Sequence, residues 1–275
     1  MISPYWGGVN AVVEAMRNVA SVGATPHAIT DCLCYGNPEK PKQMWEFVEG
    51  TRGISDACNA ITLKDNPSYP IPIIAGNVSF YNESKNGPIP PSPIVSCLGR
   101  LKDIDYVLSM DFQSSGSDIL MVGERKDELG GSIYYQLLGE LGANVPKPDF
   151  VEVRSQIFAV TDCAEGGLIL SCHDISDGGI ATSIAEMTFR KNIGCLVKIP
   201  GDLLDHKILF SETGGFVIET KKENTENVIK VFKAHGLHAS KIGETGGEYI
   251  QLNETIKVKV SEARHRWENG LREKL

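Results

Sequence analysis

The first clear pattern in the chain is an apolar stripe with helical spacing close to its start. Within residues 9–22, valine, methionine and alanine side chains recur at intervals of three and four, which predicts an amphipathic helix. Gly23 then stands where glycine commonly ends a helix. Residues 27–33 predict a short strand, and residues 41–61 predict a second long helix with Pro41 in its first turn.

Short apolar runs bounded by glycine and proline predict the next elements. Residues 71–75 form such a run and are taken as a buried strand, and residues 87–101 contain a proline-rich turn followed by another strand. Beyond a small-residue connector at 111–117, helical and strand patterns keep alternating. The predicted strands there are 118–124, 215–220 and 249–252; the predicted helices lie in 127–141, 155–169, 225–236 and 260–275; and 170–190 is predicted as a strand, a loop and a helix.

The order of these elements predicts the fold class. Because helices and strands are mixed throughout, we expect a chain of α/β and α+β class built of two units, at 1–112 and 113–275. No strand pattern precedes the first helix, so we expect the unit at 1–112 to lack its first strands. Whether Met1 is a natural start stays open.

The composition of the chain limits the classes of function that it can have. The chain has 275 residues, of which 41% are hydrophobic and 23% charged, as in a globular protein with a sizeable core. Its formal net charge of −8 argues against a nucleic-acid surface, although metal ions and helix N-termini can still hold anionic small substrates. No apolar run approaches the roughly 20 residues that span a bilayer, and the N-terminus has no leader-like stretch, so we expect a cytoplasmic protein.

The seven cysteines are scattered and form no CxxC pair. Cys32 and Cys34 are spaced too tightly for the usual zinc knuckle. We interpret all seven as free, buried thiols in a reducing compartment.

Polar residues follow two of the predicted strands at their carboxyl ends, where ligands gather in open α/β sheets. Gly76 permits close approach of a ligand, Asn77 offers a carbonyl oxygen suited to Mg²⁺, and Ser79 offers a hydroxyl to a phosphate or sugar. Asp31 ends the other strand, so the two strands together predict one magnesium-nucleotide site. The alternative is a pair of ordinary strand-to-turn transitions in which Asn and Asp bond to their own backbone.

The segment 173–179, HDISDGG, predicts a second phosphate cradle. His173 and Asp174 end a strand, Ser176 or Asp177 is placed to cap the next helix, and two glycines allow close backbone approach. His173 as a general base is the alternative.

Two further acidic positions are weaker metal candidates. Glu212 precedes a Thr-Gly-Gly turn and is either a metal ligand or part of that turn. Glu14 and Asn18 share one helical face, as metal ligands or as a solvated surface.

Taken together, these motifs resemble one family. The chain is similar to the C-terminal half of the synthetase subunit of phosphoribosylformylglycinamidine synthase, in its smaller form. The later motifs are shared more widely with the AIR synthetase-like superfamily. The segments that carry the resemblance are GGVNAVVEAMRNVASVGATP, TDCLCYGNPEKP, GNVSFYNE, ELGGS and HDISDGG, in that order.

The resemblance implies a fold and an activity. The fold is an AIR synthetase-like N-terminal-type α/β domain, whose strands pair in a barrel with a homologous half, followed by a C-terminal-type α+β domain. The activity is an ATP-dependent C–N ligation in purine biosynthesis: formylglycinamide ribonucleotide (FGAR), ATP and ammonia give the amidine, ADP and phosphate. A glutaminase subunit supplies the ammonia, with a small bridging subunit, and the cofactors are ATP and Mg²⁺.

The resemblance also implies roles for single residues. Asp31 and Gly76 match positions that contact ATP, Asn77 matches a magnesium ligand, and Ser79 matches a contact to the ribonucleotide. In larger forms of the family, positions matching Asp174 and Ser176, with Glu14 and Asn18, hold a second, non-reacting nucleotide with magnesium.

The family's catalytic residues that are absent from this chain predict that it needs a partner for activity. The catalytic histidine, the ATP-binding lysine and most metal carboxylates of the family belong to the other half, so we expect no catalytic residue in this chain and no activity from it alone. The required partner is the N-terminal half or a second copy. Two alternatives stay open: a non-catalytic nucleotide-holding module of a purine-synthesis complex, or another kinase or synthetase of the superfamily.

Overall fold

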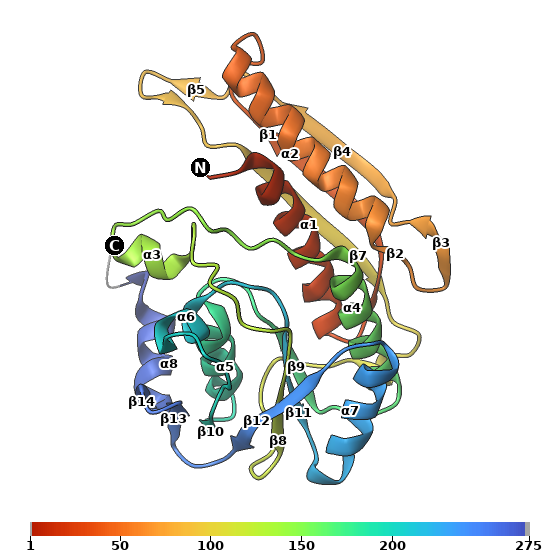
Figure 1. Cartoon of the computed structure of the whole chain (residues 1–275), viewed down its shortest axis with the longest axis vertical. Helices are drawn as coiled ribbons and strands as arrows, with labels where there is room; N and C mark the ends of the chain where they lie inside the picture. Colours follow the sequence, from red (N-terminus) through yellow and green to blue (C-terminus); the bar gives the residue numbers. More distant parts are fainter. Residues whose placement is uncertain (1, 273–275) are drawn as a thin grey trace.

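The computed structural model describes residues 2–272, whose elements form two groups around two principal sheets (Figure 1). The first group consists of α1 (Pro4–Ser21), β1 (Thr25–Cys34), α2 (Pro41–Ala60), β2 (Thr62–Leu63), β3 (Asn66–Pro70), β4 (Ile73–Ser79), β5 (Glu83–Ser84), β6 (Gly87–Pro88), β7 (Ser92–Arg100) and the 3₁₀ helix η1 (Ile104–Tyr106). The second consists of β8 (Asp118–Val122), α3 (Ile133–Leu137), α4 (Phe150–Glu165), β9 (Ser171–Asp174), α5 (Gly179–Phe189), β10 (Cys195–Val197), α6 (Asp205–Phe210), β11 (Phe216–Thr220), η2 (Lys222–Asn224), α7 (Thr225–Ala234), β12 (Ala239–Thr245), β13 (Tyr249–Leu252), β14 (Ile256–Lys259) and α8 (Val260–Asn269). The mixed α/β and α+β class is confirmed.

The first principal sheet has three strands in the order β4-β1-β7, with β4 parallel and β7 antiparallel to β1. Helices α1 and α2 lie side by side over one face (Figure 1). The apolar stripe of α1 packs there against Ile29 and Leu33 of β1 and Ile54 of α2. Burial of this stripe explains why the helical pattern of residues 9–22 was the clearest signal in the sequence.

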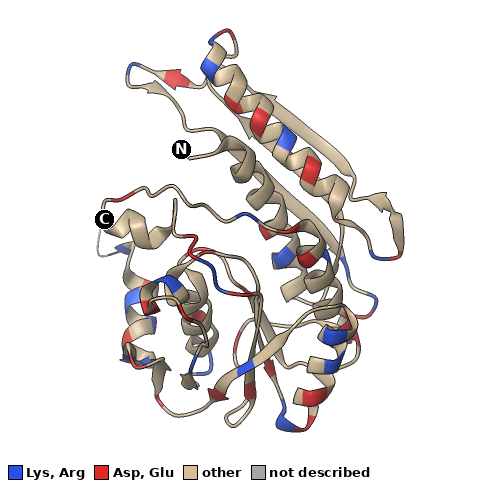
Figure 2. Ribbon diagram, viewed as in Figure 1, with Lys and Arg blue, Asp and Glu red and all other residues tan. Residues whose placement is uncertain are grey.

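The opposite face of this sheet is not covered by any described element. Ile94 and Leu98 of β7 are 57% and 50% exposed on it. Strand β4 is a sheet edge, and all but its last residue are exposed, so the prediction of a buried strand at 71–75 was wrong. The buried apolar residue of that run is Ile71, which precedes β4. Figure 2 shows β4 without charged residues and α2 with residues of both charge signs along its length.

The second principal sheet has seven strands in the order β14-β13-β10-β12-β8-β11-β9 and is covered on both faces. The alternation of side chains along β8 divides the interior into two cores. Leu120 and Val122 face the core shared with α1, α4 and α7, whereas Ile119 and Met121 face the core shared with α5, α6 and α8. Both sides of this sheet are therefore filled by the chain itself.

Helix α1 belongs to both groups, because it packs on α2 and β7 and also on α4 and β9. One continuous core accordingly contains Met16 of α1, Ile29 of β1 and Ile157 of α4. The division at 112/113 lies in the segment between η1 and β8 and stays a prediction.

Several element boundaries differ from those predicted. The first helix begins at Pro4, because the Ser3 hydroxyl accepts a hydrogen bond from the Trp6 amide and caps it. The helix predicted in 127–141 is only the short α3, which ends before Gly139 in a left-handed conformation. Helix α8 ends at Asn269, and the last residues of the predicted 260–275 helix, 273–275, lie outside the described residues. No helix within residues 2–272 is long and apolar enough to cross a membrane.

Candidate functional site

The register of β1 against β4 brings the four residues of the first predicted site close together. Asp31 is paired with Gly76, Cys32 with Asn77, and Cys34 with Ser79. Asp31 lies within β1, and Gly76 and Asn77 lie within β4, so none of the three is at a strand end as predicted. The two strand segments lie side by side in one short stretch of parallel ladder.

The alternation of the pleat nevertheless divides these residues between two faces. Asp31 and Leu33 point toward α2, where they border a cavity of about 310 Å³. A Cβ at Gly76 would collide with the Asp31 carboxylate, so any larger residue here requires that side chain to move. Asn77 lies on the uncovered face, where its Oδ1 accepts a hydrogen bond from the Cys32 thiol at 3.1 Å. A ligand that touches both Asp31 and Asn77 must pass around the free edge of β4.

Burial shapes the electrostatics on the α2 side of β1. Desolvation raises the pKa of Asp31 above its usual range. The Tyr35 hydroxyl is buried without a hydrogen-bond partner, and its pKa is raised to about 12 by burial and by the charges of Asp31 and Glu46. This side of the strand is a partly dry pocket that disfavours additional negative charge unless a cation accompanies it.

Ser79 is held by a residue that the sequence analysis did not single out. The Asn82 carboxamide donates to the Ser79 hydroxyl at 3.1 Å, to the Ser79 carbonyl at 2.9 Å and to the Tyr35 carbonyl at 3.0 Å. Asn82 thereby fixes the chain just beyond β4. Its place three residues after Ser79, at the end of a strand, is the only sequence signal for this role.

Asn77 supplies the hard oxygen ligand on this face. Asn77 supplies a carboxamide oxygen, which suits Mg²⁺. Among residues 2–272 no group of three or more His, Cys, Asp or Glu side chains is placed to hold a metal ion. Asn77 therefore fits as one ligand of a cation whose other ligands come from elsewhere.

The HDISDGG segment forms a strand-to-helix turn, but its cap differs from the prediction. Neither Ser176 nor Asp177 caps α5; its N-cap is Gly178, in the left-handed conformation with φ 77°. The Glu212 carboxylate accepts hydrogen bonds from the Gly178 amide at 2.9 Å and the Ile133 amide at 2.8 Å. No side chain caps α5, and the Glu212 carboxylate, 34 residues away in sequence, instead holds the amide of the N-cap residue Gly178 itself.

A second cavity, of about 280 Å³, opens beside this turn. Glu14, Ser176 and Glu212 line it, whereas Asn18 is exposed and is not among its lining residues. Burial, together with the charges of Asp174 and Asp177, raises the pKa of Glu14. The structure thus joins Glu14 with Ser176 but does not bring Asn18 to the same place.

Asp174 is not among the residues that line this cavity; it is buried, with its Oδ2 lacking a hydrogen-bond partner. Burial alone would raise its pKa, but the hydrogen bond from His173 and the charges of His173 and Arg17 lower it. Arg17 is itself buried, at 4% exposure, and its guanidinium borders the cavity. An orphaned carboxylate oxygen fits a cation, although Arg17 already supplies positive charge here.

His173 is not suited to act as a general base. Its Nδ1 lies 3.2 Å from Asp174 Oδ1, and its Nε2 lies 3.0 Å from Glu186 Oε2. Burial would lower its pKa, but the two carboxylates outweigh that effect and raise it to about 9. The imidazole is therefore protonated and paired at neutral pH.

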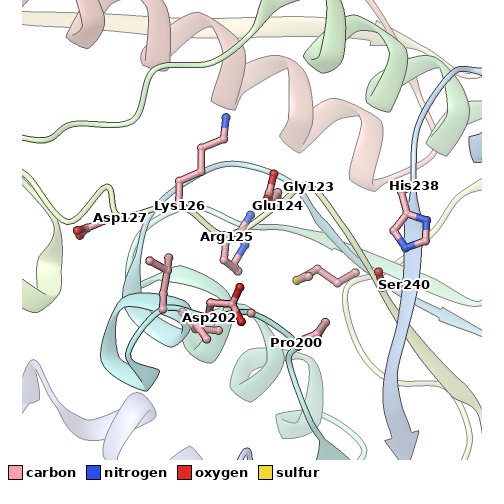
Figure 3. Close-up of a pocket in the computed structure, with 13 residues that line it drawn as sticks. Gly123, Glu124, Arg125, Lys126, Asp127, Pro200, Asp202, His238 and Ser240 are labelled. Carbon is pink, nitrogen blue, oxygen red and sulfur yellow. The ribbon is translucent and has the colours of Figure 1, made fainter.

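A further cavity, of about 670 Å³, lies at the end of β8, where the sequence analysis made no prediction. Figure 3 shows Lys126 extending upward toward the red ribbon of α1, and Asp202 and His238 on other sides of the opening. None of the predicted site residues lines this cavity.

Comparison with known protein families identifies the family of this chain. Residues 1–101 match the N-terminal domain of AIR synthase related proteins, and residues 114–252 match the C-terminal domain. The chain belongs to the AIR synthase related protein family. The paired segments of β1 and β4 thus lie in the first matched domain, and the HDISDGG turn lies in the second.

Individual relatives within the family are known. The chain is 44% identical, over 99% of its length, to phosphoribosylformylglycinamidine synthase subunit PurL of Methanothrix thermoacetophila, and 37% identical, over 95%, to PurL of Methanothermobacter marburgensis. In both cases it spans 36% of the relative's length. The chain therefore corresponds to about a third of these proteins.

Solved structures confirm the fold. PurL of Thermotoga maritima complexed with FGAR superimposes with a TM-score of 0.75 at 21% identity, covering 96% of this chain and 43% of that one. The hydrogenase maturation protein HypE in complex with ATP gives 0.66 at 18% identity, covering 92% of this chain and 78% of that one. The AIR synthetase-like architecture expected from the motifs is confirmed.

Proposed function

We propose that this chain is part of an ATP-dependent phosphoribosylformylglycinamidine synthase, which converts FGAR, ATP and ammonia into the amidine, ADP and phosphate. The observation that carries the proposal is the 44% identity to a PurL subunit over 99% of this chain. The reaction needs positioning and charge neutralisation more than a nucleophilic side chain, which agrees with a site built from strand ends.

The paired segments of β1 and β4 form one wall of the proposed site. Asp31 and the backbone at Gly76 contact ATP, Asn77 holds Mg²⁺, and Ser79 contacts the ribonucleotide. Bound Mg²⁺ supplies neutralisation of the phosphate charge. Asn82 keeps the Ser79 hydroxyl in place through its 3.1 Å hydrogen bond and is a positioning residue.

The other wall comes from a second AIR synthetase-like half, either the N-terminal half of the synthetase or another copy of this chain. The uncovered sheet face and the exposed edge strand β4 support this, because unpaired strand edges and apolar surface favour association. Ammonia comes from a glutaminase subunit with a small bridging subunit, and the assembly acts in the cytoplasm.

Substitution of Asn77 tests this function. We expect Asn77→Ala to abolish FGAR-dependent ADP release in an enzyme reconstituted from this chain and the N-terminal half of an archaeal PurL. Asn66→Ala, at an exposed position of β3, is the matched control and should leave turnover unchanged. Unchanged turnover in Asn77→Ala, with the fold verified by circular dichroism, would sink the assignment.

The cavity beside the HDISDGG turn favours a second candidate function, a nucleotide-holding module. In that case Asp174 and Ser176 bind a second, non-reacting nucleotide with Mg²⁺, and Glu14 contributes from α1. Equilibrium dialysis with labelled ADP and Mg²⁺ tests it: Ser176→Ala should weaken retention while leaving the fold intact. Equal ADP retention by wild type and Ser176→Ala would count against this function.

A further inference from the structure

Two cysteine side chains lie together on the uncovered face of the first sheet. Cys32 and Cys34 are two residues apart on β1, so both point to the same side. Their Sγ atoms are 3.9 Å apart, and both side chains are half-buried. The prediction that all seven thiols are buried is wrong for these two, as it is for Cys97.

The distance between the two sulfur atoms is close to that of two thiolates bound to one metal ion. It is too long for a disulfide bond. A disulfide needs its sulfurs about 2.05 Å apart. Two thiolates bound to one tetrahedral Zn²⁺, with bonds of about 2.3 Å, stand roughly 3.8 Å apart. The 3.9 Å separation found between Cys32 and Cys34 therefore needs almost no adjustment to hold such an ion.

The surroundings leave the remaining coordination positions open. Asn77 Oδ1 lies 3.1 Å from the Cys32 sulfur on the same face and is available as a third ligand. Within the described part of the chain, no third His, Cys, Asp or Glu completes the group. The donor set is thus two soft sulfurs and one amide oxygen, which selects a thiophilic ion over Mg²⁺.

We propose that Cys32 and Cys34 form an open two-thiolate site for a tetrahedral thiophilic divalent cation such as Zn²⁺ or Cd²⁺, next to Asn77. On binding, two metal–sulfur bonds form and the two thiol protons pass to solvent, so no redox partner is required. The site uses residues of this chain alone and does not depend on the proposed function. An ion in it would compete with any ligand of Asn77.

Titration of the reduced, metal-free full chain with Cd²⁺ tests the site, followed by thiolate-to-metal charge-transfer absorption in the ultraviolet. We expect one Cd²⁺ per chain with the signal of two thiolates. Cys34→Ser should weaken binding by more than the ~10–100-fold that loss of an outer-shell partner typically costs. Cys97→Ser is the matched control, because Cys97 is also half-buried but packs toward the helices, and it should bind like the wild type.

A second measurement needs no variant. Zn²⁺ should protect Cys32 and Cys34 from iodoacetamide, read by mass spectrometry, and should leave alkylation of Cys97 unchanged. Absence of stoichiometric Cd²⁺ binding by the wild type, equal binding by Cys34→Ser and Cys97→Ser, or protection that does not distinguish Cys32 and Cys34 from Cys97 would each overturn the proposal. None of these outcomes touches the turnover of the reconstituted enzyme, so failure here is separate from failure of the proposed function.

Discussion

The two principal sheets of this chain differ in how many of their faces are buried. The seven-stranded sheet is packed on both faces, with Ile218 of β11 fully buried in one of its two cores. The sheet β4-β1-β7 is packed on one face only and leaves Ile94 of β7 exposed on the other. The first arrangement is complete in itself, whereas the second presents a face and an edge that another chain or segment can use. The candidate ATP-binding residues lie in the incomplete sheet, at the place where a partner would add its own groups.

Matched isoleucine substitutions give the largest expected contrast between the two sheets. Ile218→Ala should reduce the free energy of unfolding by about 2–5 kcal/mol, because it leaves a cavity in a closed core. Ile94→Ala should change it by no more than about 0.5 kcal/mol in the isolated chain. Urea denaturation measures both, and equal losses would refute the view that one sheet face is uncovered.

Gly76→Ala probes the helix-covered side of the incomplete sheet. The added methyl group collides with the Asp31 carboxylate, so we expect a loss of about 1–3 kcal/mol in the free energy of unfolding. Asp31→Ala in the same chain should restore part of it, because the obstacle is removed. Ala75→Ser, at the exposed neighbouring position, is the control and should be close to neutral. Additive losses in the Gly76→Ala, Asp31→Ala double variant would show that the two residues do not touch.

The pairing of His173 predicts a pH dependence in the complete sheet. Its pKa is raised in the folded protein from 6.5 to about 9, so its contribution to stability is complete below pH 6.5 and is lost as the pH rises toward 9. We expect the free energy of unfolding to fall between pH 6.5 and 8 by at most about 1.4 kcal/mol per pH unit. His173→Gln should remove this slope. An identical slope in wild type and variant would contradict the pairing with Asp174 and Glu186.

Substitution of Glu212, beside the start of α5, should have the smallest effect on the free energy of unfolding. Glu212→Ala removes the acceptor of the Gly178 and Ile133 amides and should cost about 1 kcal/mol of unfolding free energy. Glu212→Gln keeps an acceptor oxygen and should retain most of that stability. The exposed Glu254 serves as control. Thermal unfolding of the three variants measures the difference, and a Glu212→Ala protein as stable as Glu254→Ala would show that these two hydrogen bonds do not stabilise the fold.

Patterns of local origin were predictable from the sequence. Apolar residues at helical spacing and helix-start residues predicted α1 and α2, and the alternation of apolar runs with turn residues predicted the fold class. Both kinds of pattern depend only on neighbours within a few residues. The sequence also predicted that Asp31 and Gly76 converge on one place, and the register pairs them, although neither residue lies at a strand end.

Features that depend on distant neighbours were not predictable. The exposure of β4 depends on which strands flank it, and the division of Asp31 and Asn77 between two faces depends on a register that contains an irregularity between Ile29 and Thr30. The amide of Gly178 before α5 is held by Glu212, whose distance in sequence gives no local signal. Asn82 acts through three hydrogen bonds that only the folded chain brings together.

The most direct test of the proposed half-site is ADP release by this chain with ATP, Mg²⁺, ammonia and FGAR, measured with and without the N-terminal half of a PurL relative. We predict no turnover by the chain alone and turnover after the half is added, because the paired segments of β1 and β4 form only one wall of the site and we expect the N-terminal half to supply the other. Turnover by the chain alone would contradict the expected need for the N-terminal half and would mean that two copies of this chain build a complete site between them.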